Sequence, residues 1–298
     1  MSEDARSIVV GADGGASDGP ALRWAAKLAH RTGLPLVAVH SSEPEALAAR
    51  AAGAGAPDIT ALLEAEDARA EAVRETVTAL AEELGITATT VVERGSPVRS
   101  LLEHQGQAAL IVVGTGRKGA LEEFVLGTTS IGVAAHATVP VVVINPEVDV
   151  EALDTGRIAV AIDGSDDSEA AARAAVRYAA LSGSSITAVT AWYLEVVNGY
   201  VVTEPDSPEW KQIERDREEM LRDVLRPALQ DHPDVQVDYQ VRRGPIVPTL
   251  TEASRDVDLV VVGSRGRGAF TGRLLGSVSQ RVMRSAVCPV MVVTAPRR

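Results

Sequence analysis

The sequence predicts two successive α/β domains, each a five-stranded parallel sheet of strand order 3-2-1-4-5 with helices on both faces. Three observations lead to this prediction. The 298 residues suffice for two domains of ordinary size. Blocks of the first half recur in the second half in the same order. Short apolar runs alternate with helical stretches, which is typical of sheets built from βαβ units.

Internal repetition divides the chain into two copies of one domain. Four blocks match at an offset of 149 or 150: residues 8–14 with 158–164, 91–95 with 240–244, 109–114 with 258–263, and 139–143 with 288–292. One nearly constant offset indicates a duplicated domain rather than a short-period repeat. We place the domains at residues 1–147 and 155–298, with a linker within 146–156.

Each copy supplies the strands and helices that the fold needs. Strands are expected at 6–12, 34–41, 86–93, 108–114 and 139–145, and again at 157–162, 185–192, 235–242, 257–263 and 289–294. They are nearly continuous in apolar residues, as expected for strands covered on both faces. Helices are expected near 18–32, 58–84, 97–106, 128–137 and 208–230. Right-handed crossovers then favour a Rossmann-like arrangement. The stretches 42–57 and 194–207 are the least regular and suit loops.

Composition and charge exclude several classes of partner. Hydrophobic residues make up 46% and aromatic residues 3%, so the cores must be aliphatic. A net charge of −12 repels nucleic acid and anionic lipid, and we expect neither as a partner. Basic residues do gather at 281–284 and 297–298, but these runs are short and lack aromatic residues.

Location follows from other features of the sequence. The single cysteine, Cys288, cannot form an intrachain disulfide. The N-terminal residues lack the apolar core of a signal peptide, and no run reaches the roughly 18 apolar residues of a membrane helix. A cytoplasmic location is therefore expected.

A glycine-rich segment at residues 263–279 follows a strand and leads into a helix that is expected to begin near Ser277. Glycine can adopt positive φ and let backbone N–H groups approach a ligand, and a helix N-terminus favours anions. Ser277 is expected to be the N-cap, and Ser279 to add a donor. The loop recurs at 114–130, and both loops leave the carboxyl end of a strand, where open α/β sheets bind ligands. These features predict a phosphate site, although a flexible surface loop remains the alternative.

Better-known motifs do not fit. The chain has no G-x-x-x-x-G-K-[ST] sequence, and the G-x-G-x-x-G at 114–119 follows the fourth strand and is not repeated at 263–268. These facts exclude a P-loop and a dinucleotide-binding dehydrogenase. Receiver domains place an aspartate at the end of the third strand, where this chain has Arg94-Gly95 and Arg243-Gly244. The five histidines lack zinc-site spacing, and no G-x-S-x-G elbow occurs.

The spacing Gly263-x2-Gly266-x9-Gly276-Ser277 resembles the phosphate loop of the ATP-binding branch of the universal stress protein family. The strand ending in Asp163-Gly164-Ser165 and the closing residues 288–293 resemble the same family. The likeness covers nearly the whole chain twice, as in the tandem form of the family. It implies ATP as the ligand, together with Mg²⁺, and a regulatory role in the stress response.

The resemblance also implies roles for single residues. Asp13 and Asp163 would reach the adenine end of the nucleotide, and the strand ends at His40-Ser41 and Thr190-Ala191 would read adenine through the backbone. A structural cap remains the alternative for the two aspartates. The positions implied to contact phosphate and ribose are Gly263, Gly266, Gly276, Ser277 and Ser279 in the second copy and Gly114, Gly127, Thr128 and Ser130 in the first.

The two copies differ at the loop. Arg117 stands where the second copy has Gly266, and Gly15 replaces Ser165. A side chain at position 117 restricts positive φ. We therefore predict that the C-terminal half binds ATP more tightly than the N-terminal half.

A binding module is favoured over an enzyme. Phosphoryl transfer needs a metal-holding acid and a group that positions the nucleophile, and neither is visible beside the loops. No residue is assigned a catalytic or metal-binding role, and a slow ATP hydrolase or phosphotransferase is the alternative. The last strands, Pro140–Ile144 and Pro289–Val293, are apolar and at a sheet edge, so we expect them to pair the two halves. A homodimer is expected through further surfaces, and the sequence does not identify a downstream protein partner.

Overall fold

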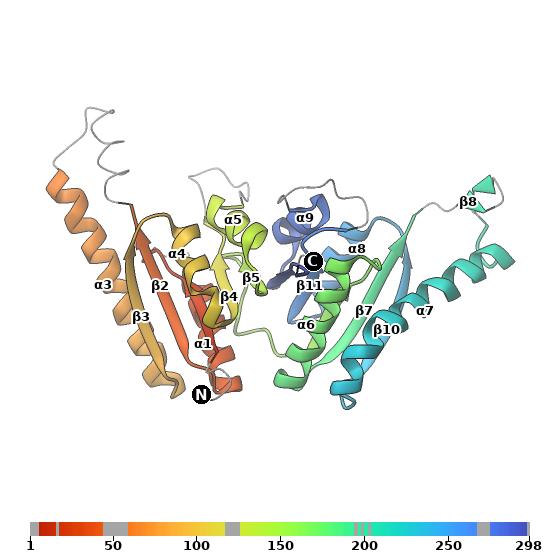
Figure 1. The fold of residues 1–298 in the computed structure, drawn as a ribbon, viewed down its shortest axis with the longest axis horizontal. Helices are drawn as coiled ribbons and strands as arrows, with labels where there is room; N and C mark the ends of the chain where they lie inside the picture. Colours follow the sequence, from red (N-terminus) through yellow and green to blue (C-terminus); the bar gives the residue numbers. More distant parts are fainter. Residues whose placement is uncertain are drawn as a thin grey trace. The chain divides into compact units, whose positions relative to one another are not determined.

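The computed structural model describes residues 6–15, 18–43, 59–116, 126–193, 196–197, 200–201, 204–266 and 275–296. The chain separates into two compact units, Met1–Val150 and Glu151–Arg298. The two units repeat one architecture, a parallel sheet between two layers of helices (Figure 1).

The N-terminal unit contains a five-stranded sheet of order β3-β2-β1-β4-β5. Every neighbouring pair in this order is parallel. Its elements are β1 (Ser7–Gly11), α1 (Gly19–Thr32), β2 (Leu36–Ser42), α3 (Ile59–Leu84), β3 (Ala88–Arg94), α4 (Pro97–Glu103), the 3₁₀ turn η2 (His104–Gln107), β4 (Ala108–Gly114), α5 (Thr128–His136) and β5 (Val141–Ile144).

The C-terminal unit has the matching order β10-β7-β6-β11-β12, again with parallel pairs throughout. Its elements are β6 (Arg157–Ala161), α6 (Asp166–Ser182), β7 (Ser185–Trp192), β8 (Val196–Val197), β9 (Tyr200–Val201), α7 (Pro208–Asp231), β10 (Val237–Arg243), α8 (Ile246–Ala253), β11 (Leu259–Gly263), α9 (Ser277–Ser285) and β12 (Val290–Val293). The antiparallel pair β8–β9 lies in a stretch that the sequence predicted to be irregular.

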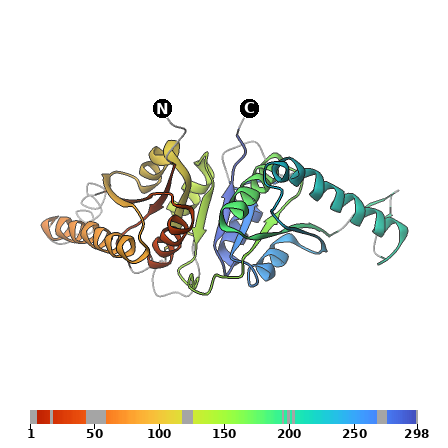
Figure 2. The same ribbon diagram turned by 90° about the horizontal axis from the view of Figure 1, so that it is seen from below.

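The predicted fold class and strand order are confirmed in both units. In the N-terminal unit α1 packs with α3 on one face of the sheet and α4 with α5 on the other; in the C-terminal unit α6 pairs with α7 and α8 with α9 (Figures 1 and 2). Because both faces are covered, most residues of the central strands are buried. The largest fully buried side chains are almost all aliphatic, which matches the low aromatic content.

Two further observations bear on the expectations from composition. Cys288 is buried, and burial raises the pKa of its thiol to about 12, so the residue is a neutral packing group. In the described ranges, no helix is both long and apolar enough to cross a membrane.

The strand order determines where a ligand can bind. In a parallel sheet the carboxyl ends of all strands lie at one edge. The order reverses between β1 and β4 and between β6 and β11, and a crevice opens outside such a switch point. In the N-terminal unit Asp13 follows β1 and Gly114 ends β4. In the C-terminal unit Asp163 follows β6 and Gly263 ends β11.

Candidate functional site

Asp163 lies just beyond β6, at the switch point of the C-terminal sheet. Its Oδ1 accepts hydrogen bonds from the backbone N–H of Ser165 at 3.0 Å and from the Ser165 hydroxyl at 2.6 Å. Ser165 in turn caps α6 by accepting from the N–H of Ser168 at 3.3 Å. One carboxylate oxygen of Asp163 thus has the structural role of a turn cap.

The other oxygen of Asp163 faces the start of the glycine-rich loop. A β-carbon placed on Gly266 would lie 2.6 Å from Asp163 Oδ2. A β-carbon at residue 266 would therefore require the Asp163 carboxylate to shift, so glycine lets the backbone pass close to this carboxylate. The structure therefore brings together the acidic residue and the loop glycine that the sequence had linked only by resemblance.

A buried carboxylate, Asp167, anchors the first residues of the loop. Its Oδ2 accepts from the Ser264 hydroxyl at 2.7 Å and from Arg265 Nε at 3.2 Å, while Oδ1 accepts from the N–H of Ala295 at 3.0 Å. The residue is only 5% exposed. A buried charge is tolerated when it is paired and hydrogen-bonded, and both conditions hold here.

Sequence reasoning missed Asp167. It lies in the acidic first turn of α6, beside the exposed Asp166. Acidic residues are common in the first turn of any helix because they interact favourably with its dipole. No feature of the sequence distinguishes the inward acid from its exposed neighbour.

The two ends of the loop are tied together at Ser264. Its carbonyl accepts from the N–H of Gly276 at 2.8 Å and from the Ser279 hydroxyl at 3.0 Å. Ser279 is 2% exposed, and its hydroxyl also lies 2.9 Å from the Gly276 carbonyl. A β-carbon on Gly276 would lie 3.1 Å from the Ser264 oxygen, so a larger residue would strain this closure. The Ser279 hydroxyl therefore holds the loop ends together from the inside.

The expected N-cap at Ser277 is wrong by one residue. Gly276 is the N-cap, with φ −65° and ψ 152°, and its carbonyl accepts from the N–H of Gln280. Ser277 is the exposed first residue of α9. Glycine suits the cap position because a β-carbon there would crowd the Ser264 carbonyl. No side chain caps α9, so its N-terminus keeps the anion-attracting character of an uncapped helix end.

Gly263 has a packing role. A β-carbon on it would lie 2.8 Å from the carbonyl carbon of Asp167. Glycine at the end of β11 thus allows α6 to approach the strand closely. Gly263, which was predicted as a site residue, therefore supports the site by packing closely against the backbone of α6.

The N-terminal unit carries a second acid at the end of β1. Asp13 Oδ1 accepts from the N–H of Gly15 at 2.7 Å, as in a turn cap. Asp18 Oδ2 accepts from the N–H groups of Asp13 at 2.6 Å and Gly14 at 2.7 Å. Burial, followed by the charge of Asp13, raises the pKa of Asp18 to about 7. At the corresponding place the C-terminal unit has a neutral side chain, the Ser168 hydroxyl, 3.4 Å from the N–H of Asp163.

The N-terminal loop repeats the pattern with looser contacts. Gly127 is the N-cap of α5, and Thr128 is its exposed first residue. The hydroxyl of the buried Ser130 donates to the Gly127 carbonyl at 2.9 Å. A β-carbon on Gly127 would meet its nearest atom, the Gly116 nitrogen, only at 3.7 Å. Gly114 ends β4 as predicted, whereas Arg117 lies outside the described residues.

The predicted base-reading residues lie near the carboxyl ends of β2 and β7. The Ser41 hydroxyl donates to the Gly95 carbonyl at 2.7 Å, and Ala191 is half-buried on β7. His40 is 2% exposed; its Nδ1 lies 3.0 Å from the Ala12 carbonyl and its Nε2 3.8 Å from Glu66 Oε2. The hydrogen bond of the Ser41 side chain thus stabilises the turn after β3.

The sequence profile described as the universal stress protein family matches residues 5–145 and 155–294. The chain belongs to the universal stress protein family. A universal stress protein of Mycolicibacterium smegmatis is 35% identical over 293 residues, which cover 96% of each chain. The two matched segments show that the family domain occurs twice in tandem.

A solved structure agrees with this fold over nearly the whole chain. The crystal structure of a universal stress protein from Archaeoglobus fulgidus covers 99% of this chain and 100% of its own, with a TM-score of 0.69 at 18% identity. A universal stress protein solved in complex with cAMP is 27% identical and covers 47% of this chain and 97% of its own, with a TM-score of 0.34.

Proposed function

We propose that this universal stress protein binds ATP and acts as a nucleotide-dependent regulatory module of the cellular stress response. The observation that carries the proposal is the meeting of Asp163, Gly266 and the uncapped N-terminus of α9 at the switch point of the C-terminal sheet. The tight passage at Gly266 and the closure at Gly276 would hold these groups in place for a ligand.

The polarity of this arrangement complements a nucleotide. A carboxylate accepts hydrogen bonds, so Asp163 suits the hydroxyl groups of ribose or the amino group of adenine. The helix N-terminus donates N–H groups and attracts anions, so α9 suits the phosphates. In this proposal Ser277 and the backbone of Gly266 and Gly276 contact the phosphate and ribose. The backbone of Ala191 contacts the base. Gly263 and Ser279 support the loop, through packing against α6 and through the hydrogen bond to the Ser264 carbonyl.

A second, weaker ATP site is proposed in the N-terminal unit. Asp13 and the backbone of Ser41 would hold the adenine end, and Gly114, Gly127, Thr128 and Ser130 would form the phosphate side. Mg²⁺ would be coordinated chiefly by the phosphates and water, with few protein ligands. In the described part of the chain, no three His, Cys or acidic residues are grouped to hold a metal.

The remaining parts of the proposal concern location and assembly. We place the protein in the cytoplasm and expect the last strands, Pro140–Ile144 and Pro289–Val293, to pair the domains, with further surfaces forming a homodimer. Edge strands of this apolar kind tend to find partners. Light scattering that gives a strict monomer at all concentrations would contradict the homodimer.

The direct test is to denature the purified protein and identify any released nucleotide by mass spectrometry. We expect ATP. Calorimetry with ATP, ADP and cAMP then ranks the ligands, and a protein that neither retains nor binds ATP would overturn the proposal. Phosphate release under excess Mg·ATP tests the alternative of an ATP hydrolase, since rapid turnover is incompatible with a module that holds ATP.

A single substitution tests the proposed geometry. Gly266→Ala would push a methyl group against Asp163 Oδ2, and we expect ATP affinity of the C-terminal site to fall about tenfold. Gly106→Ala is the matched control, because a β-carbon there meets no atom within 4 Å. Equal ATP affinity of the two variants would show that the passage at Gly266 does not form the site.

A further inference from the structure

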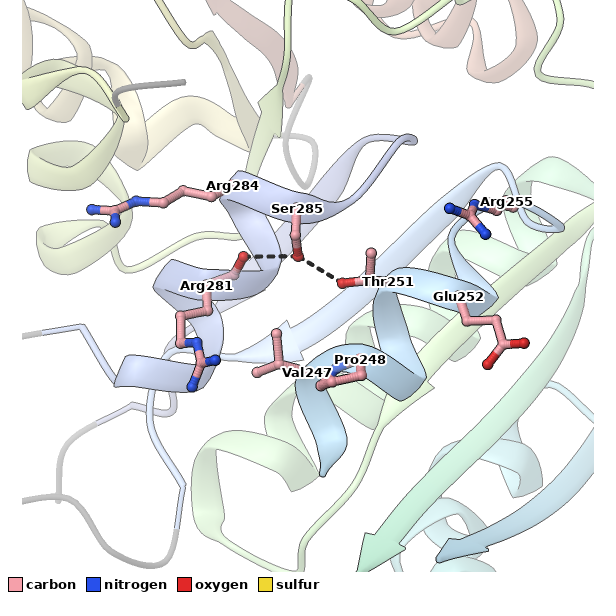
Figure 3. Close-up of a pocket in the computed structure, with 8 residues that line it drawn as sticks. All are labelled: Val247, Pro248, Thr251, Glu252, Arg255, Arg281, Arg284 and Ser285. Carbon is pink, nitrogen blue, oxygen red and sulfur yellow. Dashed lines mark hydrogen bonds between the residues drawn. The ribbon is translucent and has the colours of Figure 1, made fainter. Parts of the chain in front are cut away.

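A groove of about 600 Å³ lies between α8 and α9 of the C-terminal unit (Figure 3). Val247 and Pro248 supply apolar surface, and the Thr251 and Ser285 hydroxyls lie 2.6 Å apart between the helices. The Ser285 hydroxyl donates to the Arg281 carbonyl, so Thr251 is the donor to Ser285. Because both hydroxyls already donate a hydrogen bond within the protein, the charged side chains are the main polar groups that the groove presents to a ligand.

Three arginines give this groove its charge. Arg281 and Arg284 come from α9, and Arg255 follows α8; all three are exposed. Within the ranges that the structure describes, none of them forms an ion pair, and Glu252 is the one acid that lines the groove. The groove is therefore positive on a chain whose net charge is −12. Basic groups that lack an internal partner are suited to an external one.

The groove is a property of this copy and not of the fold. At the matching positions the N-terminal unit has Gly106, Gly132 and Ala135 in place of the three arginines. A β-carbon on Gly132 would lie 2.8 Å from Val98 Cγ2, so α4 and α5 touch where Arg281 stands in the C-terminal unit. Both units have this pair of helices, α4 with α5 and α8 with α9, whereas the three arginines occur only in the C-terminal unit.

We propose that this groove binds a short acidic segment of a partner protein. Figure 3 shows the three guanidinium groups pointing to different sides, an arrangement that suits several carboxylates spread along a peptide better than one compact anion. Arginine binds carboxylates through two parallel hydrogen bonds. The apolar surface of Val247 and Pro248 would take an apolar side chain between the acids. A long nucleic acid would extend beyond the groove onto a chain whose net charge is −12, which disfavours it.

The test uses the full chain and a fluorescein-labelled 12-residue peptide of Asp and Glu with one central Leu. A peptide with Asn and Gln in place of the acids is the reference. Fluorescence anisotropy should show binding of the acidic peptide that weakens with salt, because the contacts are exposed charges. Equal binding of the two peptides would overturn the proposal.

Two triple variants locate the site. Changing Arg255, Arg281 and Arg284 to Gln should lower peptide affinity about tenfold. Changing Arg173, Arg215 and Arg226 to Gln removes the same charge from exposed positions on α6 and α7 and should leave affinity within about twofold.

The remaining outcomes are also decisive. Equal weakening by both triple variants would reveal a general charge effect and overturn the groove. A 12-nucleotide single-stranded DNA that binds more tightly than the peptide and depends on the groove arginines would assign nucleic acid instead. Should the triple variant fail to fold, Arg284→Glu alone must still weaken the peptide, because it changes one exposed side chain and its new negative charge repels the acidic peptide.

Discussion

The two units have one fold but stabilise their loops with different chemistry. In the C-terminal unit a buried carboxylate, Asp167, joins the loop start at Ser264 and Arg265 to Ala295, which follows β12. In the N-terminal unit the residue matching Ser264 is Thr115, whose hydroxyl donates to Asn145 Oδ1 at 3.0 Å. Gly114 and Gly127 match Gly263 and Gly276, so at these ends of the loop the two units differ in polar neighbours that the motif does not include.

The units also differ in charge at the end of the first strand. Asp13 and Asp18 lie together in the N-terminal unit, whereas Asp163 is accompanied by the neutral Ser168 in the C-terminal unit. The C-terminal unit also has a second carboxylate beside its loop, Asp167, but Arg265 pairs with it. In the N-terminal unit backbone N–H groups hold Asp18, and burial raises its pKa to about 7.

The largest effect is expected from Asp167→Ala. It would remove the partner of Arg265, Ser264 and the Ala295 N–H, at a cost of about 3 kcal/mol in the free energy of unfolding. Hydrogen exchange should rise in β11, α9 and β12 and remain unchanged in the N-terminal unit. Asp166→Ala, on the exposed side of the same turn, is the control and should cost well under 1 kcal/mol. Comparable exchange in the two variants would show that the buried carboxylate does not anchor the loop.

A smaller effect is expected from the cap glycines. Gly276→Ala presses a methyl group on the Ser264 carbonyl at 3.1 Å, a cost of about 1 kcal/mol, or several-fold in ATP affinity. Gly127→Ala meets nothing closer than 3.7 Å and should change affinity less. Calorimetry is the measurement, because a Gly→Ala change also stabilises through the unfolded state and obscures stability readings. If Gly127→Ala removes more ATP binding than Gly276→Ala, the asymmetry between the halves is wrong.

A pH-dependent effect is expected from Asp18. Its pKa is raised from 3.8 to about 7 in the folded protein, so protonation favours the folded state. The stability that this contributes is complete below about pH 4 and is lost as pH rises through 7. The unfolding temperature of the wild type, relative to Asp18→Asn, should therefore fall between pH 5 and pH 8. Asp67→Asn, exposed on α3, is the control. A difference that stays constant over this range would contradict the raised pKa.

Most of the architecture could be predicted because it depends on local composition and spacing. The apolar runs at 108–114 and 257–263 coincide with β4 and β11 within a few residues, and the charged 208–230 stretch is α7. The short pair β8–β9 was missed because strands of two residues have no periodicity to detect. The N-cap of α9 was misplaced because serine is the commoner cap and the crowding at Ser264 is a long-range contact.

By itself, the sequence determined the duplication, the strand order and the positions of the loop glycines, since a constant offset and apolar periodicity are properties of the chain alone. Only the tertiary structure decided which of two adjacent acids turns inward at Asp167 and that Gly263 serves packing. It alone revealed that Arg255, Arg281 and Arg284 line one groove. These features depend on contacts between residues some 25 to 130 positions apart, and such contacts exist only once helices and strands have packed.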